Sequence, residues 1–171
     1  MIWFKDWFNS PYYHLLYKNR DYTEAQNFID NLIIHLKIPK LSKLLDIGCG
    51  KGRHAIYFNK KGMDVIGYDL SKNNINSAKK FENKTLKFFV HDMRVTFKKN
   101  TFDIVTNLFT SFGYFENDNE EQKTINKMAL NLKNEGILII DFMNSKKAVK
   151  KLVKSEKKVV EGLTFNITKK I

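Results

Sequence analysis

The chain has 171 residues, of which 43% are hydrophobic and 13% aromatic. This composition suits a single folded domain and excludes a largely disordered chain. No apolar run reaches the length of a membrane span, the start lacks the pattern of a signal peptide, and the single cysteine, Cys49, excludes an intrachain disulfide. We therefore expect a cytoplasmic protein with no membrane contact and no metal site.

The formal net charge of +12 comes from 27 lysines but only 3 arginines. Arginine makes the bidentate contacts that are typical of specific nucleic-acid sites. The lysines are scattered, except for a cluster over residues 145–160. These observations favour a solvated surface, with nucleic acid as a less favoured alternative partner.

The elements alternate along the chain. Apolar residues at helical spacing predict a helix over 22–37, inside an N-terminal helical cap of residues 1–40. The patterns that follow predict strands over 43–47, 63–69, 86–92, 102–109 and 136–143, with helices over 52–62, 72–83 and 117–134 between them. The fifth strand is continuously apolar, so we expect it to be buried on both faces. A basic helix and one half-buried strand, the start of a β extension, follow in residues 146–171.

Strands that alternate with helices indicate an α/β fold with a doubly wound, mostly parallel sheet. We expect one domain over 1–171, with the ligand-binding core in 41–145. Ligands of such sheets bind beyond the carboxyl ends of the strands. Asp46, Asp69, Asp92 and Asn107 each stand at such an end. Their shared position predicts one site at this edge of the sheet.

Three glycines, Gly48, Gly50 and Gly52, follow the first strand and open a helix. A glycine turn at a helix N-terminus lets a ligand contact the backbone directly. Dinucleotide sites favour G-x-G-x-x-G, whose third glycine would fall at Arg53 in this chain. The spacing therefore argues against a NAD-dependent oxidoreductase.

The acid before the glycines, the acid at the end of the second strand and "HDM" at 91–93 resemble motifs of the class I S-adenosylmethionine (SAM)-dependent methyltransferases. The strings "GCGKGRHA", "HDMR" and "NLFTSFGYF" are similar to those of one bacterial group in that superfamily. The resemblance implies a Rossmann-like sheet that binds SAM and releases S-adenosylhomocysteine. It further implies that this chain lacks the usual last two strands and is truncated at its C-terminus. An uncovered sheet edge would favour a homo-oligomer.

The resemblance also implies roles for individual residues. Asp46 would order the glycine loop and face the SAM ammonium, Asp69 would accept both ribose hydroxyls, and Asp92 would accept from the adenine amino group. The remaining implied cofactor contacts are Tyr17, Arg20, Gly48, Cys49, Gly50, Leu70, Met93, Asn107 and Leu108. Arg20 would clamp the SAM carboxylate, unless it only pairs with Asp21 or Glu24.

The acceptor side is less defined by the sequence. His14, Phe112 and Tyr114 are the candidate substrate contacts, and no residue is assigned as a catalytic base. The expected function is methyl transfer from SAM to an oxygen or nitrogen of a small molecule. The alternatives are SAM binding without catalysis, RNA methylation and, least favoured, nicotinamide-dependent oxidation.

Overall fold

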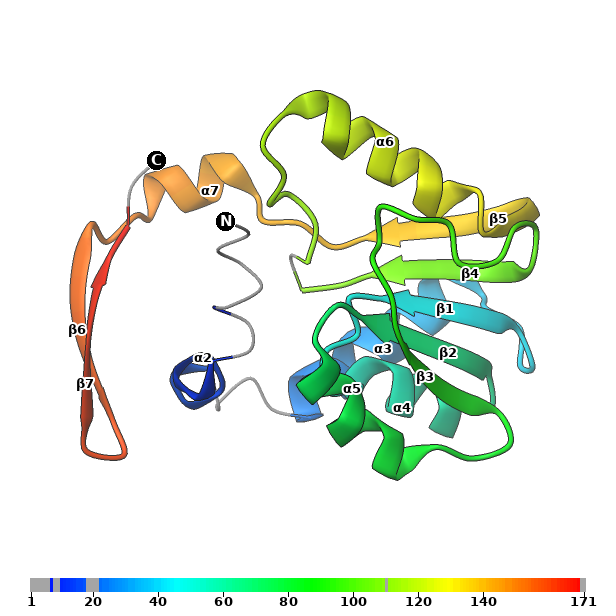
Figure 1. Cartoon of the computed structure of the whole chain (residues 1–171), viewed down its shortest axis with the longest axis horizontal. Helices are drawn as coiled ribbons and strands as arrows, with labels where there is room; N and C mark the ends of the chain where they lie inside the picture. The colour runs from blue at the N-terminus through cyan, green and yellow to red at the C-terminus, as the bar shows by residue number, and fades with distance from the viewer. Residues whose placement is uncertain (1–6, 8–9, 18–21, 110, 170–171) are drawn as a thin grey trace.

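A five-stranded parallel sheet forms the centre of the computed structural model, which describes residues 7, 10–17, 22–109 and 111–169 (Figure 1). Its strands are β1 (Lys43–Ile47), β2 (Asp64–Asp69), β3 (Leu86–Val90), β4 (Phe102–Asn107) and β5 (Leu132–Ile140). They lie in the order β3-β2-β1-β4-β5, and all neighbouring pairs are parallel. The strand order reverses between β1 and β4, which is where open sheets of this kind bind their ligands. The predicted fold class is confirmed.

Helices cover both faces of the sheet. Figure 1 shows α3 (Tyr22–Leu36), α4 (Arg53–Lys60) and α5 (Lys72–Ala78) on one face and α6 (Asp118–Ala129) on the other. A short 3-10 turn, η1 (Lys79–Phe81), extends α5. Serine and asparagine side chains begin two of these helices: Ser71 Oγ accepts the Asn74 N–H, and Asn117 Oδ1 accepts the Glu120 N–H.

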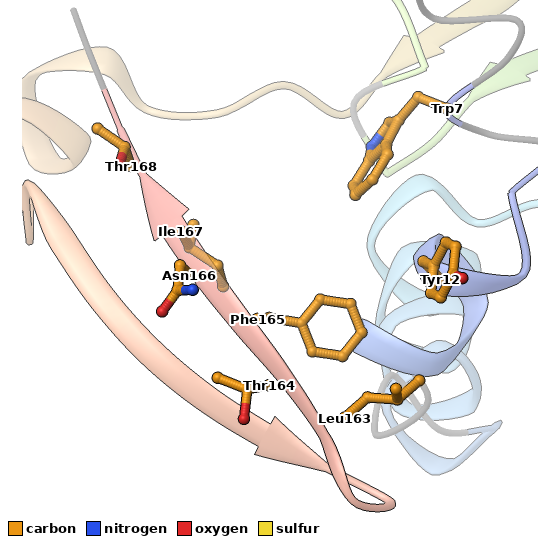
Figure 2. Close-up of a pocket in the computed structure, with 8 residues that line it drawn as sticks. All are labelled: Trp7, Tyr12, Leu163, Thr164, Phe165, Asn166, Ile167 and Thr168. Carbon is orange, nitrogen blue, oxygen red and sulfur yellow. The ribbon is translucent and has the colours of Figure 1, made fainter.

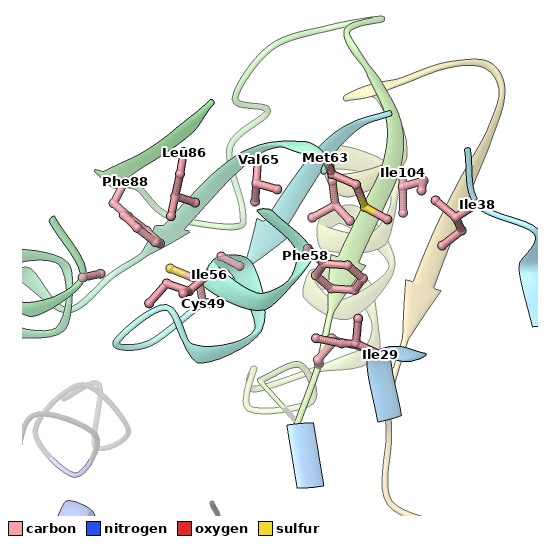
Figure 3. Packing of buried hydrophobic residues seen from close by; sticks show 14 of the residues in the cluster. Ile29, Ile38, Cys49, Ile56, Phe58, Met63, Val65, Leu86, Phe88 and Ile104 are labelled. Atoms are coloured by element: carbon pink, nitrogen blue, oxygen red, sulfur yellow. The ribbon is translucent and has the colours of Figure 1, made fainter. Parts of the chain in front are cut away.

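Each face of the sheet has its own apolar core. Ile29, Phe58 and Phe88 belong to the core under α3, α4 and α5, and all three are fully buried (Figure 3). Met128 of α6 packs with Leu45 and other residues of the opposite face. The two cores therefore pack the helices against opposite faces of the sheet.

The expectation that β5 is buried on both faces is wrong. None of its nine residues is buried, and Ile137 is 39% exposed. β5 is the last strand of the sheet, and no other strand among the described residues pairs with its outer edge. An apolar run reports side-chain character, whereas burial depends on what covers the strand.

The C-terminal region contains two strands where the sequence predicts one. β6 (Ser155–Val160) and β7 (Leu163–Thr168) form an antiparallel hairpin after α7 (Ser145–Lys150). The sequence of β6 is rich in lysine and lacks the apolar–polar alternation that predicts a strand. Figure 1 shows the hairpin apart from the sheet, with α2 (Pro11–Leu16) between the hairpin and the carboxyl ends of the strands.

No helix in the described ranges is long and apolar enough to cross a membrane. The same ranges contain no group of three or more His, Cys, Asp or Glu side chains placed to hold a metal ion.

Candidate cofactor site at the carboxyl edge of the sheet

The glycine loop between β1 and α4 has a conformation that other residues avoid. Gly48, Gly50 and Gly52 have φ angles of +69°, +57° and +86°. A Cβ on Gly48 would lie 2.8 Å from the Ser111 Cβ, and one on Gly52 would lie 2.7 Å from the Phe88 Cζ. Close packing by the protein itself therefore requires glycine at these two positions.

Gly50 is different, because the position that its Cβ would take lies in open space. Among the described residues, apart from its two chain neighbours, no atom lies within 4 Å of the position that a Cβ on Gly50 would take. Its N–H donates to Asp69 Oδ2 at 2.9 Å, which ties the loop to the end of β2. The open space at this tied position is what a ligand in contact with the backbone requires.

Asp69 stands at the edge with part of its surface exposed. Its Oδ1 accepts the Ser71 N–H at 2.8 Å, in addition to the Gly50 contact of Oδ2. Burial raises the pKa of its carboxyl, while the N–H groups of Ser71 and Gly50 and the side chain of Asn74 oppose that change by hydrogen bonding. A carboxylate has about four lone-pair sites, so capacity remains for a further donor from a ligand hydroxyl. Its role toward the ribose stays a prediction.

Asp46 is more deeply buried than the resemblance implies for a ligand contact. Its side chain is 1% exposed, and Thr106 Oγ1 donates to its Oδ1 at 2.9 Å. Its Oδ2 has no hydrogen-bond partner in the described structure. Burial raises its pKa to about 7, and the negative charge of Asp69 acts in the same direction. The role of Asp46 toward the SAM ammonium stays a prediction.

The predicted ammonium acceptors at the end of β4 already have donors. The Asn107 carbonyl accepts the Asp141 N–H at 2.9 Å, and the Leu108 carbonyl accepts the Ser111 hydroxyl at 3.1 Å. The Asn107 side chain donates to the Ile47 carbonyl at 2.9 Å, while its Oδ1 is buried with no partner among the described residues. An ammonium group here would share carbonyls with the protein.

Two predicted contacts follow β3. Asp92 forms an ion pair with Arg94, whose Nη2 lies 2.6 Å from Asp92 Oδ2. Burial alone would raise the pKa of Asp92, but the guanidinium and N–H of Arg94 hold it below its usual value. Met93 packs against the core of the α6 face. The adenine role of Asp92 stays a prediction, and Arg94 competes for its oxygens.

Cys49 faces the protein and not the edge. Its side chain is 6% exposed, and its N–H donates to the Tyr68 carbonyl at 3.0 Å. Burial raises the pKa of its thiol well above the usual value, which keeps the thiol protonated. Only its backbone is available for the predicted cofactor contact. Leu70, directly after Asp69, is half-buried, and its packing on adenine stays a prediction.

The loop after β4 is held in place by Phe109. This residue has a φ of +62°, and its N–H donates to Asp141 Oδ2 at 3.1 Å. The Arg53 guanidinium lies 3.9 Å from the Phe109 ring centroid, and the His54 ring lies 5.4 Å from it. Burial lowers the pKa of His54 to about 3, so this imidazole is neutral near pH 7. Phe109 thus joins the loop to the start of α4.

Some of the candidate substrate and cofactor contacts lie in the described part of the chain, and others do not. Phe112 and Tyr114 are half-buried in the loop after β4, and the Phe112 ring lies 6.4 Å from the Phe115 ring. Tyr17 follows α2 directly as its C-cap residue and contacts Tyr13, with ring centroids 5.0 Å apart. Arg20 and the side chain of His14 lie outside the described part of the chain, so their roles stay predictions.

Two residues at this edge were not predicted. Asp141 follows β5 directly, so the rule that pointed to the other strand ends should have found it. Ser111 donates to the Gly48 and Leu108 carbonyls and packs on Gly48. Ser111 lies within the quoted string at 107–115, but no role was assigned to it, because its contact with Gly48 joins segments that are far apart in the chain.

A family model described as a methyltransferase domain matches residues 38–170. Among individual proteins, the chain is 30% identical over 133 residues to a dTDP-3-amino-3,4,6-trideoxy-alpha-D-glucopyranose N,N-dimethyltransferase of Streptomyces venezuelae. That alignment covers 75% of this chain and 54% of the relative. The chain spans about half the length of the curated relatives that it matches.

Solved structures share the fold. The sugar N-methyltransferase KedS8 from Streptoalloteichus sp. superposes with a TM-score of 0.68 at 25% identity, over 89% of this chain and 62% of that one. SAM-bound CalS10, an amino pentose methyltransferase from Micromonospora echinaspora, superposes with a TM-score of 0.67 at 22% identity. This second match covers 90% of this chain and 66% of that one, and it shows a shared fold.

Proposed function

Since this chain belongs to the class I SAM-dependent methyltransferases, we propose that it transfers a methyl group from SAM to an amine nitrogen of a sugar-like small molecule. The Streptomyces relative and KedS8 are named as sugar N-methyltransferases, and these names support the acceptor class. SAM is the cofactor of the whole superfamily, whereas the class of methyl acceptor is our proposal.

The observation that carries the proposal is the tie between Gly50 and Asp69. Gly50 is the glycine of this loop whose Cβ position lies in open space, and its N–H donates to the carboxylate at the next strand end. The loop therefore leaves its backbone accessible beside a carboxylate that can accept a further hydrogen bond. A nucleoside with an amino-acid tail could use both.

SAM supplies a methyl group that is already activated on a sulfonium. The protein's task is to hold the acceptor nitrogen in line with that methyl and to exclude water. The glycine loop and Asp69 hold the cofactor, and the loop after β4 forms one wall of the reaction site. Phe112 and Tyr114 provide aromatic surface on that wall, which suits an acceptor with a cationic amine.

Calorimetric titration with S-adenosylhomocysteine tests the cofactor part. We expect the wild type to bind and Asp69→Ala to lose about tenfold or more in affinity, because charge-assisted hydrogen bonds to the ribose disappear. Asp103→Ala is the control, since Asp103 pairs with Lys133 on the surface. Absence of binding by the folded wild type, or equal affinity of Asp69→Ala, would contradict the proposal.

A further inference from the structure

Arg94 connects two parts of the predicted site, the cofactor contact Asp92 and the loop after β4 that carries the candidate substrate contacts. Its backbone N–H and its Nε each donate to Asp92 Oδ1 at 3.0 Å. Its Nη2 donates to Asp92 Oδ2 at 2.6 Å, and Nε also lies 3.1 Å from that oxygen. On the other side, its Cζ lies 5.8 Å from the centroid of the Phe115 ring, close enough for a cation–π attraction. One side chain therefore lies against both segments.

The guanidinium of Arg94 fixes the orientation of the Asp92 carboxylate. Its contact through Nε and Nη2 joins both carboxylate oxygens, so the carboxylate cannot turn without breaking it. Of the about four lone-pair sites of a carboxylate, the three N–H groups of Arg94 fill three, and a site on Oδ2 remains. The side chain of Asp92 is 28% exposed, so a ligand can reach it. One oxygen of a fixed carboxylate is thus left to accept from an amino group.

Arg94 also keeps Asp92 charged. Burial alone would raise the pKa of Asp92, but the hydrogen bonds and the charge of Arg94 lower it, and a positive charge on His91 acts in the same direction. Tyr68 is the other titratable group nearby. Burial and the negative charge of Asp92 raise the pKa of Tyr68, so its hydroxyl stays neutral. Loss of Arg94 should therefore let Asp92 take up a proton at a higher pH than in the wild type.

The loop after β4 and the start of α6 hold Arg94 from the opposite side. The Phe115 N–H donates to Glu121 Oε1 at 3.1 Å, which ties the ring-bearing residue to α6. The hydrogen bond to Asp92 raises the pKa of Arg94 above its usual value, and the negative charge of Glu120 adds to this effect. The position of the guanidinium thus depends on this loop as well as on Asp92.

We propose that Arg94 is a positioning residue, which orients Asp92 toward the adenine amino group of the cofactor and anchors the loop after β4 beside it. The inference rests on the proposed function, because it requires SAM at this edge of the sheet. A cofactor that uses the remaining lone pair of Asp92 binds without displacing Arg94. The loop therefore keeps its place when the cofactor site is filled.

Calorimetric titration of the full chain with S-adenosylhomocysteine at pH 5 and pH 8 tests this role. Arg94→Met removes the charge and the side-chain hydrogen bonds, whereas Arg94→Lys keeps the charge. Each variant is compared with the wild type at the same pH, so the titration of other acids is common to both proteins. We expect Arg94→Met to bind about threefold more weakly at pH 8 and about tenfold more weakly at pH 5, because Asp92 is then partly protonated. Arg94→Lys should lose the same affinity at both pH values.

A double-mutant cycle separates positioning from a general structural role. If Arg94 acts through Asp92, Arg94→Met should change the affinity less than about twofold in the Asp92→Asn background. Lys133→Met is the control for the loss of an ion pair. Lys133 lies 2.6 Å from Asp103 in an exposed pair, and its substitution should leave binding unchanged at both pH values.

Phe115→Leu tests the support that the loop gives to Arg94. We expect this variant to bind S-adenosylhomocysteine about threefold more weakly, because the guanidinium loses the ring beside it. Phe165→Leu is the matched control, since Phe165 is also half-buried. Figure 2 shows Phe165 pointing toward Tyr12 across a cleft of about 550 Å³, and the described residues that line this cleft include none of the predicted cofactor contacts. Phe165→Leu should bind as the wild type does.

The outcomes distinguish this inference from the proposed function. A loss for Arg94→Met that does not depend on pH, or an undiminished loss in the Asp92→Asn background, would overturn the role of Arg94. Binding of S-adenosylhomocysteine by the wild type would still support the proposed function in that case. Absence of binding by the folded wild type would overturn both.

Discussion

Asp46→Asn should make the protein more stable at high pH relative to the wild type, while weakening cofactor binding. Asp46 is 1% exposed, its Oδ2 has no partner among the described residues, and burial raises its pKa to about 7. In the unfolded chain the carboxyl has its ordinary pKa of 3.8. Between these two pH values the folded state binds more protons, so stability falls as pH rises.

The magnitude follows from the pKa values. Each pH unit in this window costs about 1.4 kcal/mol, so the free energy of unfolding of the wild type should fall by about 3 kcal/mol between pH 5 and pH 8 relative to Asp46→Asn. Urea unfolding gives the free energy of unfolding of both proteins at pH 5 and at pH 8. Any effect of the amide that does not depend on pH is the same at both values and cancels when the two results are subtracted.

A surface acid provides the control for this experiment. Lys133 holds the pKa of Asp103 below its usual value, so the contribution of Asp103 is complete above pH 5. The stability difference between the wild type and Asp103→Asn should therefore stay constant from pH 5 to pH 8. A constant difference for Asp46→Asn as well would refute the account of Asp46 as a buried, costly charge. S-adenosylhomocysteine should bind Asp46→Asn more weakly at pH 8, since its ammonium loses an attractive charge.

We expect substitutions of Gly52 and Gly50 to affect stability and ligand binding differently. Gly52→Ala should lower the free energy of unfolding by about 3 kcal/mol, because the added Cβ meets the buried Phe88 ring at 2.7 Å in a strained φ region. Gly50→Ala should cost only about 1 kcal/mol but should weaken S-adenosylhomocysteine binding, since its Cβ enters the open space of the site. Gly62→Ala is the control for Gly50→Ala: it also has positive φ and open surroundings, and it should leave binding unchanged. Unfolding measurements and calorimetry on these variants decide both points, and unchanged binding by Gly50→Ala would contradict the glycine cradle.

Much of the fold was predictable from local patterns. The strand at 43–47 has the predicted bounds, and the helix predicted over 22–37 ends one residue earlier, at Leu36. The end of α6 was not predictable in this way. The Asn131 side chain donates to two carbonyls of α6 and accepts the N–H groups of Phe97 and Lys98. These contacts end the helix near Ala129, and half of them come from a distant segment.

The sequence could locate the site residues that stand at strand ends. It could not predict their burial or their side-chain partners, which depend on packing. Gly50 and Asp69 meet at one edge, as the parallel sheet requires. The burial of Asp46 and the ion pair between Asp92 and Arg94 depend on how neighbouring segments cover them, which no local pattern reports. The pairing of β6 with β7 needed the structure, because the lysine-rich strand β6 has no clear strand pattern.

A crystal structure of the chain grown with S-adenosylhomocysteine tests the central claim most directly. We expect ligand density at the carboxyl ends of β1, β2 and β4, with the ribose hydroxyls against Asp69 and the amino-acid tail along the backbone of Gly48 and Gly50. Density for the ligand anywhere else, or a glycine loop closed by the protein's own side chains at saturating ligand, would contradict it.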